Sequence, residues 1–186
     1  MKREANTEGA VFLDRDGTVS EEVGYMFDVS RYKIFPWTGD AIRRLNDSGM
    51  KVALATNQSG IERGYFREEM VHRVHDHLRA EIARSRARLD AAYFCPHHPN
   101  SGCPCRKPRP GMLIRGQVEL DIDLGCSYMV GDRYGDVHAG NAAGVTTVLV
   151  LTGDGREEHE RHKSEEVQPD LIAEDLAEAV DLILKR

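Results

Sequence analysis

The chain has 186 residues, which is enough for a sizeable hydrophobic core, and we expect a single domain over residues 1–186. Its 25 Lys and Arg residues and 31 Asp and Glu residues give a formal net charge of −6. Because the basic residues form no long run, we expect no nucleic-acid partner held by phosphate neutralisation. Apolar residues make up 40% and charged residues 30% of the chain, which excludes a disordered or fibrous protein.

No stretch of the sequence reaches the about 18 apolar residues that a membrane-spanning helix needs, so we expect no membrane partner. The N-terminus lacks the apolar region of a secretory signal peptide, which favours a cytoplasmic protein. Cys95, Cys103 and Cys105 crowd together beside histidines, a spacing that favours a metal site in a reducing compartment over a disulfide framework. Cys126 stands apart from this group, and we expect it to be a small core residue. We also expect the protein to be a monomer.

Short apolar runs alternate with segments of helical period, which predicts a doubly wound α/β fold with a mostly parallel sheet. The expected strands are 9–13, 51–55, 91–94, 127–130 and 146–150. The expected helices are 40–48, 68–86, 112–120 and 175–184. Between these elements, the pattern predicts an irregular stretch up to about residue 37 and a surface loop with partial helix over 153–168.

The longest expected helix has an apolar stripe that should face the core, made of Met70, Val74, Leu78 and Ile82. His72 and His75 lie three residues apart on the same helix. They could face a metal ion together, but the arginines and other charges around them favour a solvated face.

Acidic and hydroxyl side chains follow the ends of several expected strands. Asp14 and Asp16 follow the first strand, Thr56 follows the second, and Asp132 and Asp136 follow the fourth. Because ligands bind at the carboxyl ends of the strands in open parallel sheets, these groups should converge on one site. Carboxylates gathered at one place repel each other unless a cation neutralises them, and together with a substrate phosphate they suit Mg²⁺.

Each of these signals alone has an ordinary structural explanation. An Asp-Xaa-Asp before Gly-Thr is often a turn with self-capping carboxylates, and a Gly-Asp pair is often a helix start. A lone Thr can end a strand, and Lys107, the nearest positive candidate, could be a solvated cation. Their joint occurrence along the chain favours a catalytic site.

Taken in chain order, these segments resemble the four motifs of the haloacid dehalogenase superfamily of phosphatases. The motifs are Asp14-Arg15-Asp16-Gly17-Thr18, then Thr56, then Lys107, then residues 131–136. Segments 56–61, 95–99, 103–108 and 111–113 are similar to one family within it, the D-glycero-D-manno-heptose-1,7-bisphosphate phosphatases. The resemblance spans about residues 11–152. It implies a haloacid dehalogenase-like fold, and the intervals 16–56 and 56–107 are too full of expected elements to hold a large cap domain.

The resemblance implies an enzyme that removes the C7 phosphate of D-glycero-D-manno-heptose 1,7-bisphosphate, in the synthesis of nucleotide-activated heptose. Asp14 would attack phosphorus and become an aspartyl phosphate. Asp16 would protonate the departing sugar oxygen and then activate water. Mg²⁺ would be held by Asp14, the Asp16 backbone carbonyl and Asp132.

By the same resemblance, Thr56 and Lys107 would stabilise phosphoryl oxygens, and Asp136 would orient Lys107. The implied substrate contacts are Glu22, Val23, Gly24, Tyr25, Thr56, Asn57, Gln58, Ser59, Arg106, Lys107 and Arg133. Arg106 and Arg133 are candidates for holding the phosphate that is not cleaved, because guanidinium matches phosphate bidentately. Members of the family carry Lys as well as Arg at the position of Arg133.

The loop over about residues 95–105 offers three thiolates and one imidazole, from Cys95, His97, Cys103 and Cys105. This ligand set suits tetrahedral zinc, and four protein ligands leave no position open for water, so the zinc would be structural. The resemblance selects His97, whereas the residues alone leave His98 nearly equal. Buried unreactive thiols are the alternative to a zinc site.

The sequence alone leaves two other functions open. A histidinol-phosphate phosphatase shares this type of zinc loop, although Ser59-Gly60-Ile61 followed by Arg63-Gly64 is more similar to the heptose enzymes. A non-enzymatic binding module stabilised by zinc would leave the acidic residues at the strand ends unexplained.

Overall fold

The computed structural model describes residues 8–25 and 28–186. In this part of the chain, six strands form one parallel sheet in the order β3-β2-β1-β4-β5-β6. The strands are β1 (Ala10–Leu13), β2 (Lys51–Asn57), β3 (Ala91–Cys95), β4 (Tyr128–Gly131), β5 (Thr146–Val150) and β6 (Leu171–Ala173). The strand order reverses direction at the β1–β4 pair, which leaves a crevice at the carboxyl ends of these two strands.

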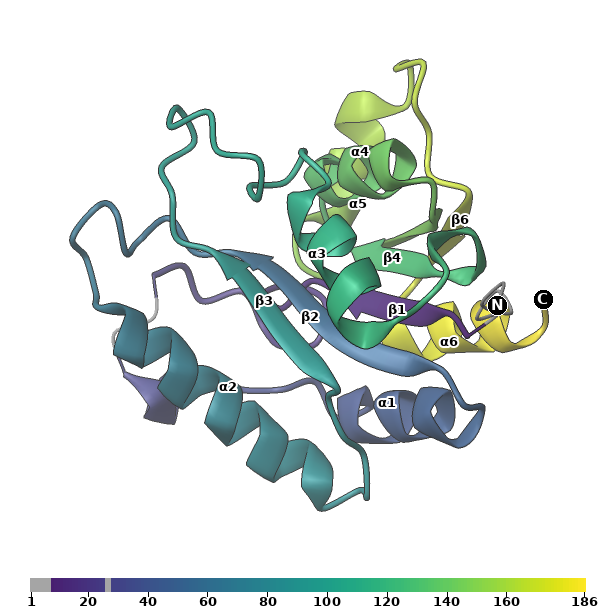
Figure 1. The fold of residues 1–186 in the computed structure, drawn as a ribbon, viewed down its shortest axis with the longest axis horizontal. Coiled ribbons are helices and arrows are strands. Elements are labelled where there is room, and N and C mark those ends of the chain that lie inside the picture. Colours follow the sequence, from purple (N-terminus) through teal and green to yellow (C-terminus); the bar gives the residue numbers. More distant parts are fainter. Residues whose placement is uncertain (1–7, 26–27) are drawn as a thin grey trace, which may run out of the picture.

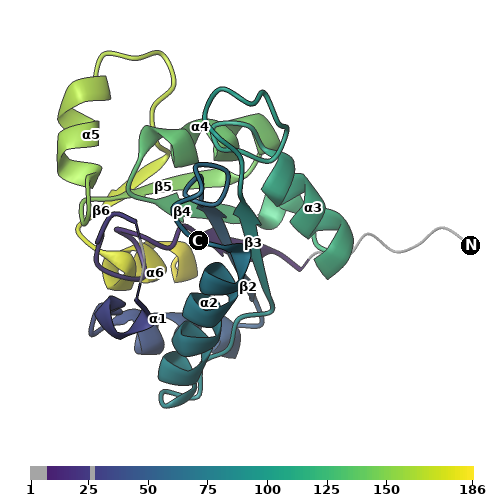
Figure 2. The ribbon, with the colours of Figure 1, turned by 90° about the vertical axis from the view of Figure 1, so that its left-hand side faces the viewer.

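Helices cover both faces of this sheet. They are α1 (Thr38–Asp47), α2 (Glu68–Ala83), α3 (Gly111–Leu120), α4 (Tyr134–Ala143), α5 (Gly155–His162) and α6 (Leu176–Leu184), with short 3₁₀ helices η1 (Val29–Arg31) and η2 (Leu124–Cys126). Figures 1 and 2 show α1, α2 and α6 on one face and α3, α4 and α5 on the other. This is the doubly wound α/β fold that the sequence predicted. No helix in the described ranges is long and apolar enough to cross a membrane.

The central strand β1 separates two hydrophobic cores. Successive side chains of a strand point to opposite faces, so Val11 and Leu13 pack with α1, α2 and α6, whereas Ala10 and Phe12 pack with α3. All four side chains are fully buried. Burial on both faces explains why β1 is a continuous apolar run rather than an alternating one.

The connections leave little room for additional domains. The described residues between Asp16 and Thr56 hold η1, α1 and β2, and those between Thr56 and Lys107 hold α2 and β3. Neither interval therefore contains a large cap domain, as expected.

Besides the two short 3₁₀ helices, the structure adds one strand and one α-helix that the sequence pattern did not indicate. The strand β6 has three residues, too few for a visible period. The helix α4 is rich in Gly and Ala and has buried residues on several sides, so it lacks a clear apolar stripe. The predicted surface loop over 153–168 contains α5, which agrees with partial helix.

Two residue-level expectations were wrong. His75 is buried rather than solvated: its ring lies edge-on to Phe94, with centroids 6.1 Å apart, and burial lowers its pKa to about 3, so the ring is neutral. Cys126 is exposed rather than buried, because it lies at the end of η2, before β4 begins. The apolar stripe of α2 does face the core, where Val74 and Leu78 are fully buried.

Candidate active site

A pocket of about 270 Å³ opens beside the carboxyl ends of β1, β2 and β4. Its lining residues come from the end of β2, the loops that follow these strands, the loop before α3 and the start of α4: Asp14, Asp16, Glu22, Gly24, Tyr25, Thr56, Asn57, Gln58, Ser59, Gly60, Phe66, Arg106, Lys107, Arg133, Gly135 and Asp136. The parallel sheet thus brings together groups that lie more than a hundred residues apart in the sequence.

Asp14 is the first residue after β1. Its backbone N–H donates to the Val130 carbonyl of β4 (2.9 Å), which extends the β1–β4 hydrogen bonding into the pocket. Its Oδ1 accepts from the backbone N–H of Arg15 (2.8 Å) and lies 2.9 Å from the Nζ of Lys107. The nucleophile candidate is therefore a carboxylate anchored at the edge of the sheet, with an ammonium group beside it.

Asp16 lies two residues further along and also lines the pocket. The Arg15 guanidinium donates to its Oδ2 from NH2 (2.8 Å) and to both carboxylate oxygens from Nε (3.1 Å). The side-chain amide of Gln58 donates to Asp16 Oδ2 (3.1 Å) and to Thr56 Oγ1 (3.0 Å). These contacts hold the Asp16 carboxylate from two sides.

Lys107 is buried between two carboxylates, with its Nζ 2.9 Å from Asp14 and 2.5 Å from Asp136. Burial acts to lower the pKa of the ammonium group, but Asp136 and Asp14 outweigh it and the pKa is raised, so Lys107 stays charged. The Asn57 side chain fixes the backbone of this residue, donating to the Lys107 carbonyl and accepting from the Lys107 N–H, both at 3.1 Å. The end of β2 thus holds the catalytic cation candidate in place.

Asp14, Asp132 and Asp136 form a buried acidic cluster in which carboxylate oxygens lie within 4.8 Å of one another. Asp136 also accepts from the backbone N–H of Arg133 (3.1 Å), at the start of α4. Burial, together with the charges of Asp14 and Asp136, raises the pKa of Asp132 to about 8. Burial and the charge of Asp14 raise the pKa of Asp136 to about 6, although Lys107 acts in the opposite direction.

The acidic cluster fits a hard divalent cation. Asp132 is fully buried, its Oδ2 accepts from the Asp154 backbone N–H (2.9 Å), and its Oδ1 has no hydrogen-bond partner among the described residues. The single positive charge of Lys107 cannot balance three carboxylates. Carboxylate oxygens are the ligands that Mg²⁺ prefers, and the unpaired Oδ1 of Asp132 is available to bind it.

Arg133 lies at the rim of the pocket, on the side of Glu22. Its guanidinium pairs with Glu22 (3.2 Å) and with Asp154 (2.7 Å), and half of its side chain is exposed. Glu22 and Asp154 already pair with Arg133. An incoming phosphate would therefore compete with these two carboxylates for the guanidinium.

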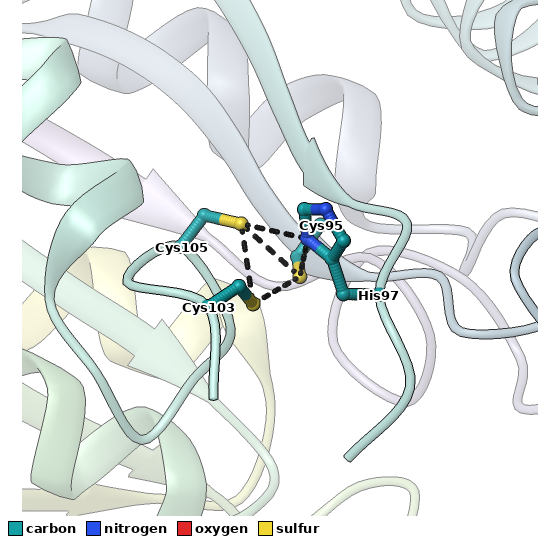
Figure 3. Close-up of side chains that lie close together, drawn as sticks. All are labelled: Cys95, His97, Cys103 and Cys105. Carbon is teal, nitrogen blue, oxygen red and sulfur yellow. Dashed lines mark hydrogen bonds between the residues drawn. The ribbon is translucent and has the colours of Figure 1, made fainter. Parts of the chain in front are cut away.

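The cysteine loop begins at the end of β3 and forms a compact cluster (Figure 3) of Cys95, His97, Cys103 and Cys105. The sulfur–sulfur distances are 3.3, 3.5 and 3.6 Å, and His97 Nδ1 lies 3.3 and 3.5 Å from two of the sulfurs. Disulfide sulfurs lie about 2.05 Å apart, so the cysteines are unbonded, whereas ligands of tetrahedral zinc lie about 3.5 to 3.8 Å apart. His98 lies outside the cluster, where its Nδ1 accepts from the Asn100 N–H (3.3 Å).

The cysteine loop also contacts the cations that follow it. Arg106 donates to the backbone carbonyl of His97 (3.3 Å), and Arg109 donates to that of Cys103 (2.8 Å). Burial raises the pKa of the Cys95 thiol, so a cation would be needed to keep this sulfur as a thiolate. Order in this loop therefore bears directly on the position of Arg106 in the pocket.

The pocket contains the predicted catalytic, magnesium-binding and substrate-binding residues with two exceptions. Val23 packs against the hydrophobic core instead of lining the pocket. Asp132 lies behind the lining, fully buried. Gly60, Phe66 and Gly135 line the pocket although sequence reasoning did not single them out. The structure explains the glycine at position 60, because a Cβ there would lie 2.2 Å from the Phe66 ring, a contact that is not visible in the sequence.

The fold and this site define a hydrolase of the haloacid dehalogenase (HAD) type, and a family model described as HAD-hydrolase-like matches residues 104–179. A D-glycero-beta-D-manno-heptose-1,7-bisphosphate 7-phosphatase of Yersinia pestis is 45% identical, covering 77% of this chain and 81% of its own length. A D-glycero-D-manno-heptose-1,7-bisphosphate 7-phosphatase of Thermosynechococcus vestitus is 43% identical over 94% of each chain.

A solved structure shows the same similarity. The crystal structure of a D,D-heptose 1,7-bisphosphate phosphatase from B. bronchiseptica, complexed with magnesium and phosphate, superposes with a TM-score of 0.87 at 35% identity, covering 95% of this chain and 98% of that one. The chain therefore belongs to the heptose-1,7-bisphosphate phosphatase family of the HAD superfamily.

The glycines around Asp132 give a test of its role in cation binding. A Cβ at Gly153 would lie 2.2 Å from Asp132 Oδ2 and 2.6 Å from the Cα of Gly17, so Gly153→Ala should displace the Asp132 carboxylate. We expect about a tenfold or larger loss of Mg²⁺ affinity, measured by isothermal titration calorimetry.

Gly144→Ala is the matched control for this substitution. Gly144 has a positive φ of 76°, comparable with the 55° of Gly153, but nothing lies within 4 Å of its added Cβ. Its variant should carry similar backbone strain and keep the Mg²⁺ affinity of the parent protein. Equal affinities for the parent and Gly153→Ala would contradict the assignment.

Proposed function

We propose that this protein hydrolyses the C7 phosphate of D-glycero-D-manno-heptose 1,7-bisphosphate through an aspartyl-phosphate intermediate, in the synthesis of nucleotide-activated heptose. The observation that carries the proposal is the constellation beside β1 and β4, in which Asp14, a member of the buried acidic cluster, lies beside the buried Lys107. Membership of the heptose-1,7-bisphosphate phosphatase family supports the sugar bisphosphate as substrate.

In the first step, a carboxylate oxygen of Asp14 attacks phosphorus and forms a P–O bond while the bond from phosphorus to the C7 oxygen breaks. Asp16 gives its proton to the departing sugar oxygen, a contribution typically worth about 10² to 10⁴ in rate. Thr56 and Lys107 stabilise the negative charge on the phosphoryl oxygens. Asp136 keeps the Lys107 ammonium group aimed at the phosphoryl group through its ion pair.

In the second step, a water oxygen attacks phosphorus and the bond between phosphorus and Asp14 breaks. Asp16, now ionised, accepts the proton of that water, and inorganic phosphate leaves. The Asp14 carboxylate and the protonated Asp16 are then ready for another substrate molecule.

Asp14, Asp132 and the backbone carbonyl of Asp16 would hold Mg²⁺, which when bound neutralises the carboxylates and polarises the phosphoryl oxygens. This ligand set differs from the geometric cluster by one member. Asp136 lies in the cluster but is engaged by Lys107, which leaves it a supporting role.

The rim of the pocket supports binding of the second phosphate and the sugar. Arg106 and Arg133 both line the pocket and would supply two guanidinium groups for the phosphate that is not cleaved. Contacts to the sugar would come from the two pocket loops, 22–25 and 56–59. Since Val23 points into the core, its backbone is the part available to the substrate.

The four ligands of the cysteine loop support a structural zinc site. We assign Cys95, His97, Cys103 and Cys105 to zinc because their spacing is close to a tetrahedral set and all four positions are taken by protein. The zinc would order the loop that carries Arg106 and Lys107. Thiolate ligands also favour a reducing compartment, the cytoplasm. We further propose that residues 1–186 form one domain and that the protein acts as a monomer.

The substrate proposal is tested by comparing the turnover of heptose 1,7-bisphosphate, histidinol phosphate and p-nitrophenyl phosphate, with and without Mg²⁺, by phosphate release. We expect Mg²⁺-dependent turnover with the highest kcat/KM for the heptose substrate. Asp14→Asn should stay folded and lose essentially all turnover, because its amide cannot form the intermediate. Preference for histidinol phosphate, or wild-type turnover by Asp14→Asn, would overturn the proposal.

The zinc proposal predicts one tightly held equivalent of zinc in protein purified without added metal, measured by elemental analysis after gentle chelation. Cys103→Ser should lower the zinc content and loosen the loop, which should raise KM through Arg106 and Lys107. Cys126→Ser is the matched control, because Cys126 lies outside the cluster and should leave the zinc content unchanged. Less than about half an equivalent of zinc in the parent protein would count against a structural site.

A further inference from the structure

Arg15 lies between the two catalytic aspartate candidates, yet its own side chain is turned away from solvent. It is 1% exposed and is among the largest fully buried side chains of the described chain. An arginine is almost never fully buried unless its charge is paired, so the environment of this guanidinium needs a specific reason. Arg15 does not line the pocket and contacts no group proposed to touch the substrate except the carboxylates on either side of it.

The partner of the Arg15 side chain is Asp16. The guanidinium contacts Asp16 with Nε and NH2 at 2.8 to 3.1 Å, and the carboxylate keeps 15% of its surface exposed toward the pocket. Two adjacent nitrogens of a planar group restrict both the position and the rotation of the carboxylate. A lysine would supply the charge but not this restriction.

The surroundings of Arg15 hold the guanidinium in turn. It stacks over the Tyr32 ring, 5.9 Å from the centroid, and Tyr32 is 4% exposed. His75 approaches from α2, and burial and the charge of Arg15 lower its pKa to about 3, so it adds no competing positive charge. Burial acts to lower the pKa of Arg15, but the negative charges of Asp16 and Asp14 outweigh it and the pKa is raised.

The backbone of Arg15 is hydrogen-bonded to Asp14, the nucleophile candidate, and to the chain that follows at Val19 and Ser20. Its N–H donates to Asp14 Oδ1 (2.8 Å), and its carbonyl accepts from the N–H groups of Val19 (3.0 Å) and Ser20 (3.1 Å). The guanidinium therefore extends from a backbone that is itself fixed. One residue thus sets the separation between the Asp14 and Asp16 carboxylates.

We propose that Arg15 is the positioning residue of the general acid and base: it holds the Asp16 carboxylate where it can exchange a proton with the leaving oxygen and with the attacking water. This inference rests on the proposed two-step phosphatase reaction. A proton-transfer group must lie within hydrogen-bond reach of its target, and a displacement of about 1 Å can cost about 10²-fold in rate. Gln58 supplies a second contact to Asp16 but no charge.

The leaving group decides whether the first step of the reaction needs Asp16, whereas the second step needs it in every case. A sugar alkoxide leaves phosphorus only with a proton from Asp16, whereas p-nitrophenolate leaves without one. The second step, attack by water, needs Asp16 as base for both substrates. Displacement of Asp16 should therefore slow both steps with a sugar phosphate but only the second step with p-nitrophenyl phosphate.

The test is stopped-flow kinetics of Arg15→Met with p-nitrophenyl phosphate, together with steady-state turnover of heptose 1,7-bisphosphate. We expect a burst of about one nitrophenolate per enzyme at nearly the parent rate, followed by slow turnover, and a loss of about 100-fold or more in kcat for the sugar substrate. Arg15→Lys should fall between the parent and Arg15→Met.

Asp16→Asn should reproduce this pattern, and Arg15→Met combined with Asp16→Asn should show little further loss, because both changes act through one carboxylate. Arg115→Met, at an exposed arginine of α3, should match the parent in both assays. Equal losses of burst and turnover, additive losses in the double variant, or parent activity in Arg15→Met would each overturn the proposal.

Tyr32→Leu extends the test to a variant that keeps Arg15, in case Arg15→Met does not fold. Loss of the ring should loosen the guanidinium and give a weaker version of the same burst pattern; parent kinetics in a folded Tyr32→Leu would contradict the proposal. The failure of the proposed function is recognised separately, since a parent protein that hydrolyses neither substrate would refute the phosphatase reaction itself.

Discussion

The active site depends on a charge imbalance that the fold imposes. Three carboxylates, Asp14, Asp132 and Asp136, meet at the carboxyl ends of β1 and β4 with one buried lysine, Lys107, among them. Burial raises the free energy of each charged carboxylate, and their mutual repulsion raises it further. A divalent cation relieves this cost, and it also draws a phosphate ester to a site that would otherwise repel it. The same feature would therefore account for both the proposed metal dependence and the proposed substrate binding.

The remainder of the site fixes positions around this charged centre. Asn57 holds the backbone of Lys107 from the end of β2, and the cysteine loop holds Arg106 through the carbonyl of His97. Arg15 does the corresponding work for Asp16 from beneath the pocket. Lys107, Arg106 and Asp16 are thus each held by a neighbouring group, which suits a reaction in which preorganised charges, rather than moving parts, stabilise the transition state.

The sequence predicted the site better than it predicted several details of the packing. Asp14, Asp132 and Lys107 could be placed together because the carboxyl ends of parallel strands share one edge of the sheet. The two-sided burial of β1 was equally visible in its apolar run. The short β6 and the Gly-rich α4 have too little periodicity to detect. His75 was predicted to be solvated because its neighbours in sequence are charged, whereas the helical period places it inward. The burial of Arg15 depends on tertiary contacts that no local sequence pattern shows.

The most direct test of the charge imbalance is the thermal unfolding of the parent protein and Asp132→Asn, each with and without Mg²⁺. At about 100 times the Kd, Mg²⁺ should stabilise the parent by about 2.7 kcal/mol, or about 5 to 10 °C. Without metal and at about pH 9, where Asp132 with its pKa of about 8 is mostly ionised, Asp132→Asn should unfold at a higher temperature than the parent, because one buried charge is gone, and Mg²⁺ should no longer raise its midpoint. A lower metal-free midpoint for Asp132→Asn, together with an undiminished response to Mg²⁺, would contradict the account.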